Sequence, residues 1–191
     1  MSITNKKVLE LNKKHKLIEN LAEREATNPE GVGFDVRAGE VYRLKGGGFL
    51  GVEDRKTPDA IKVADIKEGD KEVVLKPNDY VLVKTIEKVN LPAEKIAVED
   101  GKEPTYLMLD AYPRSTLQRS GIYFMGTKTD PGYSGELTFA LANLGNMEFR
   151  LELGARFANL MFVQVIGEVH RSYEGQWKGG RVSTEGKEKQ N

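Results

Sequence analysis

The sequence contains no cysteine among its 191 residues. This absence excludes disulfide bonds, a thiolate nucleophile and zinc sites built on cysteine. Only two histidines occur, His15 and His170, and they lie far apart in the sequence. The histidine and cysteine pattern of the zinc-dependent base deaminases is therefore absent as well.

The sequence also has no excess of charge of either sign. Lysine and arginine together number 29, and so do aspartate and glutamate. A protein that binds nucleic acid over a broad surface usually carries a basic excess. We therefore expect no nucleic-acid partner, and we expect any anion-binding site to be local.

Long apolar runs are absent too. Residues 1–16 are charged and lack the apolar centre of a signal peptide. No apolar stretch approaches the length of a membrane span, so we expect no membrane contact and a cytoplasmic protein. The last residues, 186–191, are charged, and we expect them to form a frayed tail.

What is present is a series of short β-like runs. Residues 8–21 carry apolar residues at helical spacing, which predicts one or two short helical turns. After residue 31, apolar runs alternate with turn residues, which is typical of a compact β-barrel or sandwich. We expect one domain over residues 1–191, a hairpin turn at 76–79 and a sharp reversal or mobile tip at 46–48. The expected strands include residues 41–44, 73–75, 80–85, 106–109, 122–125, 137–142 and 157–165.

Two segments carry residues suited to a phosphorylated ligand. Residues 113–119 read PRSTLQR, and residues 129–135 read TDPGYSG. An Arg-Ser pair in a turn supplies a guanidinium fork, a hydroxyl and backbone N–H groups for a phosphate chain. An Asp-Pro-Gly turn presents one carboxylate at close backbone approach to a ligand. Together they suggest a nucleoside triphosphate that is held by one loop and attacked at the next.

Five segments, in order, resemble the superfamily of trimeric dUTP pyrophosphatases and dCTP deaminases. The resemblance spans residues 17 to about 184 and implies a distorted β-barrel or jelly-roll of the β-clip type with a short N-terminal helix. It also implies a homotrimer with nucleotide sites between subunits, and a flexible segment, 171–191, that closes over the nucleotide. The segments are residues 33–38 (GFDVRA), 114–119 (RSTLQR), 130–145 (DPGYSGELTFALANLG), 154–160 (GARFANL) and 173–180 (YEGQWKGG).

The resemblance gives Asp130 the central catalytic role. The family uses an aspartate at this position to orient and deprotonate the water that attacks the α-phosphorus. Arg114, Ser115 and Arg119 would contact phosphate oxygens, and Thr116 would bind the substrate beside them. In the deaminase branch the matching serine and second arginine also help position the base and its water. The residues alone also allow a simple Asp-Pro-Gly turn and a surface turn with a salt-bridged arginine.

Further binding residues follow from the same resemblance. Tyr133 would fill the space of a ribose 2′-hydroxyl, although a tyrosine after a turn can simply pack in the core. Asp35 would help hold Mg²⁺ through bound water, with the phosphates as direct ligands. As an alternative, Asp35 caps a turn or pairs with Arg37. Arg156 and Asn159 would lie near the outer phosphates, where asparagine is one methylene shorter than the usual glutamine.

The glycine-rich tail supplies the last group of expected substrate contacts. Its glycines let backbone amides approach anionic oxygens when the tail closes, and its tryptophan would cover the base or sugar. A tail of this composition can also be merely flexible. The tail residues expected to bind substrate are Tyr173, Gln176, Trp177 and Lys178.

One position separates the two activities that the resemblance implies. In the deaminases a glutamate moves protons during attack on cytosine C4, and counting from Asp130 places it at position 140. The residue there is Ala140, and Glu136 lies about 13 Å away along an extended strand. We therefore predict a dUTP diphosphatase that uses Mg²⁺ to form dUMP and pyrophosphate. The alternatives are a zinc-independent dCTP deaminase, including a bifunctional one, and a non-catalytic deoxynucleotide-binding regulatory module.

Overall fold

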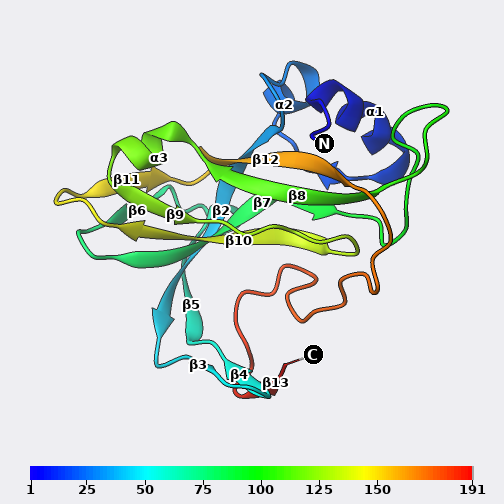
Figure 1. Cartoon of the computed structure of the whole chain (residues 1–191). Helices are drawn as coiled ribbons and strands as arrows, with labels where there is room; N and C mark the ends of the chain where they lie inside the picture. Colours follow the sequence, from blue (N-terminus) through cyan, green and yellow to red (C-terminus); the bar gives the residue numbers. More distant parts are fainter. Residues whose placement is uncertain (191) are drawn as a thin grey trace.

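Strands make up most of the regular structure in residues 1–190, the part of the chain that the computed structural model describes (Figure 1). Eight of them form one sheet that nearly closes as a barrel, in the order β8-β12-β2-β7-β10-β9, with β1 on β7 and β5 on β2. The predicted distorted β-barrel is confirmed, and every expected strand lies within an observed one. The eight strands are β1 (Ile18–Glu19), β2 (Phe34–Lys45), β5 (Asp59–Asp65), β7 (Tyr80–Asn90), β8 (Tyr106–Pro113), β9 (Ile122–Met125), β10 (Ser134–Asn143) and β12 (Arg156–Val165).

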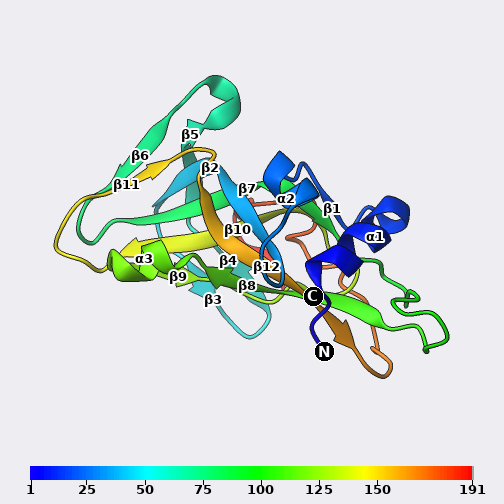
Figure 2. The ribbon, with the colours of Figure 1, turned by 90° about the horizontal axis from the view of Figure 1, so that it is seen from above.

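The N-terminal helices lie together on one side of the barrel (Figure 2). The helix predicted at the start of the chain is confirmed as α1 (Asn5–His15). The prediction is wrong for Ile18, which lies in strand β1, and the second helix, α2 (Glu23–Thr27), lies beyond the predicted range. The hydroxyl of Thr4 caps the start of α1, and Lys16 ends it in a left-handed conformation. No helix within residues 1–190 is long and apolar enough to cross a membrane.

Strand β2 joins the two halves of the sheet, because its two ends pair with different neighbours. Residues 34–37 pair with β12, whereas residues 38–45 pair with β7 and β5 beyond a bulge between Ala38 and Glu40. The first half of the strand is almost wholly buried. The GFDVRA segment therefore carries its polar side chains into the interior of the fold.

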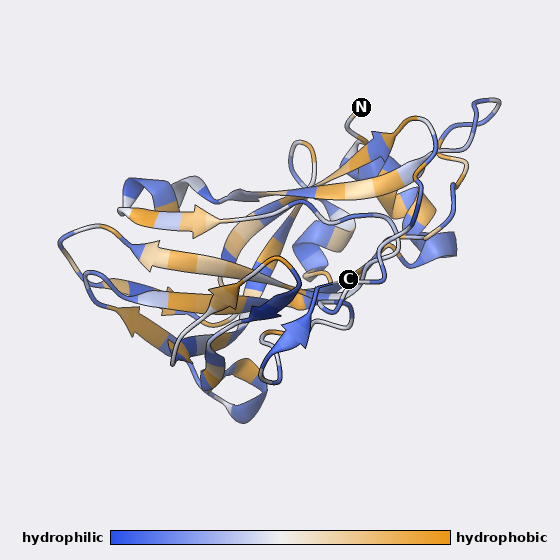
Figure 3. Ribbon diagram, turned by 60° about the horizontal axis from the view of Figure 1, so that its bottom comes forward, coloured by the Kyte–Doolittle hydropathy of each residue, from blue (hydrophilic) through white to orange (hydrophobic). Residues whose placement is uncertain are grey.

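Four phenylalanines form the centre of the hydrophobic core. Phe34, Phe139, Phe157 and Phe162 are fully buried, and the rings of Phe34 and Phe162 meet edge to face at 6.2 Å. Burying each such side chain stabilises the fold by about 1.5–3 kcal/mol. Figure 3 shows the hydrophobic residues along the long strands, with hydrophilic residues dominating the loops. The strands that carry the motif segments are thus fixed to one another by the core.

A buried ion pair adds a polar tie between β2 and β7. The side chain of Glu87 is fully buried and accepts hydrogen bonds of 2.7 Å from both the backbone N–H and the Nε of Arg37. Burial raises the pKa of Glu87, and the contacts from Arg37 oppose that rise. The alternative in which Asp35 pairs with Arg37 is therefore wrong.

The turn at residues 76–79 is present, but the hairpin predicted around it is wrong. Strand β6 (Glu72–Leu75) pairs with β11 (Phe149–Glu152) in a separate two-stranded sheet, so the turn connects two sheets. The buried amide of Asn143, at the end of β10, donates to the carbonyl of Leu75 at 2.9 Å. That bond fixes the turn against β10, which is why the chain passes from one sheet to the other here.

A small three-stranded sheet joins an early hairpin to the C-terminal residues. It contains β3 (Phe49–Leu50), β4 (Asp54–Lys56) and β13 (Glu188–Lys189), in the order β13-β4-β3. The expectation of a frayed tail is wrong for residues 188–189, because backbone pairing with β4 holds them. Two short helical segments, α3 (Ser115–Arg119) and η1 (Ile66–Glu68), complete the described elements.

Candidate active site

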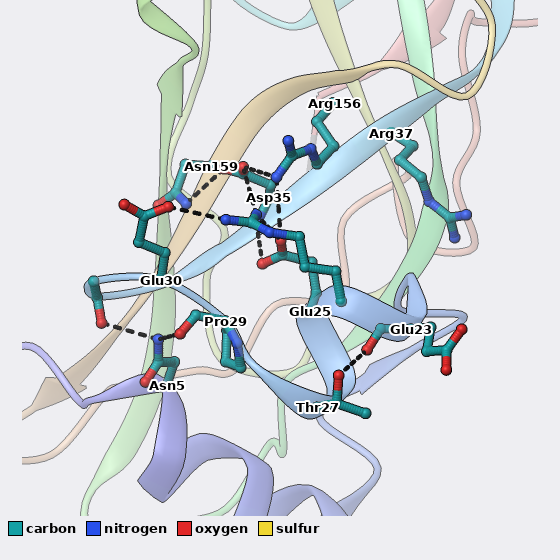
Figure 4. Close-up of polar contacts among 12 residues, drawn as sticks. Asn5, Glu23, Glu25, Thr27, Pro29, Glu30, Asp35, Arg37, Arg156 and Asn159 are labelled. Carbon is teal, nitrogen blue, oxygen red and sulfur yellow. Dashed lines mark hydrogen bonds and ion pairs between the residues drawn. The ribbon is translucent and has the colours of Figure 1, made fainter.

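A cluster of polar side chains surrounds Asp35 on β2 (Figure 4). Its Oδ2 accepts hydrogen bonds from the guanidinium groups of Arg114 and Arg156, the latter at 3.2 Å. Its Oδ1 accepts from the side-chain amide of Asn159 at 3.0 Å. Because Arg114 directly precedes α3 and the other two residues lie on β12, three of the five motif segments meet at this carboxylate.

Helix α2 supplies a second carboxylate to the Asp35 cluster. The buried side chain of Glu25 accepts from the backbone N–H of Asp35 at 3.1 Å and pairs with Arg24 at 2.8 Å. Its Oε1 also lies 3.6 Å from Arg156. No motif pointed to Glu25 in the sequence, because its role depends on the packing of α2 against β2. The cluster thus holds its arginines with carboxylates from two separate elements.

The fit of a magnesium ion to this cluster follows from the donors that are present. Within residues 1–190, no group of three histidine, aspartate or glutamate side chains is arranged to hold a metal. The oxygens of Asp35 already accept three side-chain hydrogen bonds. Mg²⁺ keeps much of its hydration and prefers phosphate and carboxylate oxygens. The described residues therefore form no protein cage for Mg²⁺, and only an ion that arrived with its own phosphate and water ligands would fit beside Asp35.

A cavity of about 430 Å³ lies beside Asp130, between β10 and the C-terminal segment. Asp130 is the one carboxylate among the described residues that line it, and its side chain is 41% exposed. Lys128, which also lines the cavity, forms an ion pair with Asp130. The lining residues are Thr57, Leu82, Thr127, Lys128, Thr129, Asp130, Tyr133, Leu137, Thr138, Tyr173, Trp177, Arg181 and Val182.

Tyr133 forms part of one wall of the cavity and is itself almost fully buried. Its hydroxyl donates to the backbone carbonyl of Glu136 at 2.6 Å, and its ring lies 5.8 Å from that of Tyr173. Burial raises the pKa of Tyr133 far above its ordinary value, so the phenol stays neutral and acts as a hydrogen-bond donor. The side chain is thus both packed and in contact with the cavity.

The C-terminal segment packs directly on the Asp-Pro-Gly loop and on the start of β10. Tyr173 donates its backbone N–H to the carbonyl of Pro131 at 2.7 Å, and Gly179 donates to that of Ser134 at 2.6 Å. Gly132 has φ +94°, and a Cβ there would lie 2.9 Å from the backbone oxygen of Tyr173. Glycine is therefore required in the loop both for its conformation and for the close approach of the tail.

Residues 3–165 match the family described as dCTP deaminase-like. The chain belongs to the dCTP deaminase-like family. It is 31% identical over 168 residues to a dCTP deaminase of Pyrococcus furiosus, and the match covers 87% of each chain. It is 32% identical over 154 residues to a probable deoxyuridine 5′-triphosphate nucleotidohydrolase of Aeropyrum pernix, over 81% of this chain and 86% of that one.

A solved structure supports the fold of this family member. A 2′-deoxycytidine 5′-triphosphate deaminase from Agrobacterium tumefaciens superposes with a TM-score of 0.59 at 15% identity. The match covers 84% of this chain and 46% of that chain. The predicted superfamily is confirmed, and membership makes the chain an enzyme of deoxynucleotide metabolism within the dUTPase and dCTP deaminase group.

The residues that the sequence singled out fall into separate groups in this family member. Asp35, Arg114, Arg156 and Asn159 meet in the Asp35 cluster, whereas Asp130 and Tyr133 line the cavity with Tyr173 and Trp177. No residue of the Asp35 cluster lines the cavity. Among the described residues, the remaining candidates neither belong to the Asp35 cluster nor line the cavity. Ser115, Thr116 and Arg119 lie on α3, and Gln176 and Lys178 lie in the tail.

Several cavity residues lay outside the sequence prediction. Lys128 precedes Asp130 by two residues, and that spacing was the one local signal for it. Thr57 and Leu82 come from distant segments, which only the fold brings to the cavity. Thr138 shares β10 with Ala140, but its exposure to the cavity depends on the path of the tail.

Position 140 has no acid in this member of the family. Ala140 lies on β10 between Leu82 of β7 and Met125 of β9, and it is almost fully buried. Glu136 is the nearest acid on the same strand, but it does not line the cavity. A Cβ on Gly180 would lie 2.5 Å from its carboxylate, so the tail backbone passes directly over Glu136. Neither position presents a carboxylate to the cavity.

Proposed function

We propose that this chain is a dUTP diphosphatase that hydrolyses dUTP to dUMP and pyrophosphate in the cavity beside Asp130. The observation that carries the proposal is which carboxylates line the cavity. Asp130 is the one carboxylate that lines it among the described residues, and Ala140 stands where a deaminase would use a glutamate. One fixed carboxylate suffices to activate water for attack on phosphorus, whereas deamination at C4 also needs proton transfer to the leaving ammonia.

In this proposal Asp130 accepts a proton from a water molecule held in line with the α-phosphorus. The water oxygen bonds to phosphorus as the bond to the bridging oxygen breaks, and pyrophosphate departs. Magnesium bound to the triphosphate would neutralise part of the charge on the leaving group. Tyr133 and Trp177 are the aromatic walls available to the sugar and the base.

The separation of the two groups supports a site shared between subunits. The arginines of the Asp35 cluster suit the phosphate chain, yet none of them lines the cavity of their own chain. In a cyclic homotrimer the cluster of one subunit would face the cavity of the next. The proposed active site would then combine Asp130 of one chain with Arg114 and Arg156 of its neighbour.

Deamination of dCTP is the second candidate, and the names of the relatives favour it. Relatives from Pyrococcus furiosus, Thermococcus kodakarensis and Pyrococcus horikoshii, at 30–31% identity, are all named dCTP deaminase. These names weigh more strongly for deamination than the name of the Aeropyrum pernix relative, a probable deoxyuridine 5′-triphosphate nucleotidohydrolase, weighs for hydrolysis. A deaminase built on this chain would have to recruit Glu136, after the tail moved away from it.

Product analysis separates the two candidates. The purified chain is incubated with Mg²⁺ and either dUTP or dCTP, and pyrophosphate, ammonia and nucleotide products are measured, with a chelator as the magnesium control. We expect pyrophosphate and dUMP from dUTP, no ammonia from dCTP and no turnover in the chelator. Ammonia from dCTP that is lost in the Glu136→Gln variant would replace the hydrolase proposal with the deaminase. Tight dUTP binding with no product would instead indicate a non-catalytic module.

A further inference from the structure

The C-terminal segment is held in place by the hairpin β3–β4, which belongs to none of the five motif segments. In Figure 1 the tail leaves β12, passes below β10 and ends beside this hairpin. Strand β13 pairs with β4, and Lys187 forms an ion pair with Asp54 at 2.6 Å. The side-chain amide of Gln190 donates to the carbonyl of Gly51. The hairpin and the end of the tail thus form one connected unit.

Two threonines add a reciprocal pair of hydrogen bonds to this connection. The N–H of Thr57 donates to the hydroxyl oxygen of Thr184 at 3.0 Å, and the N–H of Thr184 donates to that of Thr57 at 2.8 Å. The two hydroxyl groups lie 3.3 Å apart, and Thr184 is almost fully buried. Thr57 also lines the cavity beside Asp130. The contact therefore fixes the tail at the wall of the proposed active site.

Arg55 of β4 makes the second contact, on the tryptophan of the tail. Its guanidinium lies over the ring of Trp177 at 5.8 Å from the ring centroid. The Nε of Arg55 is buried and has no hydrogen-bond partner among the described residues. Trp177 lines the cavity, whereas Arg55 lines only a second pocket that also includes Trp177. Arg55 thus holds the indole through a cation–π contact without lining the cavity itself.

We propose that the β3–β4 hairpin is a positioning element of the active site, acting through Thr57 and Arg55. Thr57 fixes the path of the tail, and Arg55 fixes the plane of Trp177, so that the indole stands ready as a flat wall for the pyrimidine base. The chemical class recognised is a planar base whose face lies against the indole. This inference rests on the proposed function for its substrate, but the positioning itself is a property of the nucleotide-free protein.

The nucleotide-free protein provides the first test. Trp177 is the only tryptophan in the chain, so its fluorescence reports on this wall alone. In Thr57→Val and Arg55→Lys we expect red-shifted emission, and in Thr57→Val about 5-fold faster tryptic cleavage after Lys178 and Arg181, since the threonine contact is lost. The matched control is Thr105→Val, because the hydroxyl of Thr105 is buried and lacks a partner among the described residues. Unchanged emission and cleavage in both hairpin variants would overturn the proposal.

Kinetics provide the second test and separate this inference from the proposed function. With dUTP we expect Thr57→Val and Arg55→Lys to raise KM about 5- to 10-fold, with kcat within about 2-fold, because they disturb a binding wall and leave Asp130 intact. A fall in kcat at constant KM would contradict a positioning role. If the chain does not turn over dUTP, quenching of Trp177 fluorescence by dUTP and dCTP supplies the affinity instead. Failure of the hydrolase proposal therefore leaves the positioning role testable, and thermal unfolding of each variant establishes that it is folded.

Discussion

Asp35 and Asp130 are assigned to the same proposed reaction, but their surroundings differ sharply. The side chain of Asp35 is 6% exposed and accepts hydrogen bonds from two arginines and an asparagine. The side chain of Asp130 is 41% exposed, and its one ionic partner among the described residues is Lys128. One carboxylate is held by the fold, and the other is open to a cavity.

This difference indicates that the two aspartates have different roles. A buried carboxylate with several donors keeps those donors in place, because moving any one of them removes a hydrogen bond from a buried polar group. An exposed pair such as Lys128 and Asp130 is worth little to stability, so it can be exchanged for a ligand or a water at low cost. The surroundings of Asp35 therefore suit the proposed role of holding arginines in place, and those of Asp130 suit its proposed role in catalysis.

Asp130→Asn is the change expected to have the largest effect. The amide keeps the size of the side chain but cannot accept a proton from water, so we expect kcat for dUTP to fall by about 10³-fold or more. Nucleotide binding, followed by quenching of Trp177 fluorescence, should change little. The control is Asp100→Asn in the loop between β7 and β8, an exposed aspartate that does not line the cavity. Full activity of the Asp130 variant would remove Asp130 from its catalytic role.

Arg114→Ala should affect binding more than chemistry. Hydrogen bonds to charged groups contribute about 1.5–3 kcal/mol, so losing this arginine should raise KM for dUTP about 10- to 100-fold. Arg150→Ala is the matched control, since Arg150 is exposed and pairs with Glu72 away from both groups. An unchanged KM would indicate that the Asp35 cluster is only structural.

Mixing the Asp130→Asn and Arg114→Ala variants tests whether the two groups meet across subunits. In randomly mixed cyclic trimers, about a quarter of the sites would combine an intact Asp130 from one chain with an intact Arg114 from its neighbour. Unfolding and refolding Asp130→Asn together with Arg114→Ala should therefore restore about a quarter of the activity at low substrate. No recovery, with trimers present by light scattering, would show that each site is built within one chain.

The comparison also explains how much of this site could be predicted from the sequence. Asp130 and Tyr133 could be predicted because the Asp-Pro-Gly turn is a local signal. The barrel could be predicted from the order of the motif segments. Glu25 and Thr57 could not be predicted, because their roles arise from packing between distant segments, which no local sequence pattern indicates. The predicted hairpin at 76–79 failed for the same reason, since a turn sequence does not specify which strands pair beyond it.

Arg37 lies two residues after Asp35 but does not belong to the Asp35 cluster. It links β2 to β7 through Glu87. Glu87→Gln replaces one of the two acceptor oxygens bound by Arg37 with an amide NH2, which leaves a buried donor facing a donor, and we expect it to lower the free energy of unfolding by about 2–3 kcal/mol. For a chain of this size the midpoint of thermal unfolding should fall by about 4–12 °C. The folded variant should retain kcat, because neither Asp130 nor the cavity is touched.

The free energy of unfolding that is lost in Glu87→Gln should depend on pH. Burial raises the folded-state pKa of Glu87 above its ordinary 4.5, so as pH falls the folded protein takes up this proton before the unfolded chain does. Glu87 therefore contributes stability that is fully present below about pH 4.5 and is lost as pH rises through the folded-state pKa. Glutamine does not titrate, so the stability difference between wild type and variant, measured by denaturant unfolding, should be larger near pH 4 than near pH 8. A difference that instead grew with pH would mean that Arg37 outweighs burial and that this pair favours the ionised carboxylate.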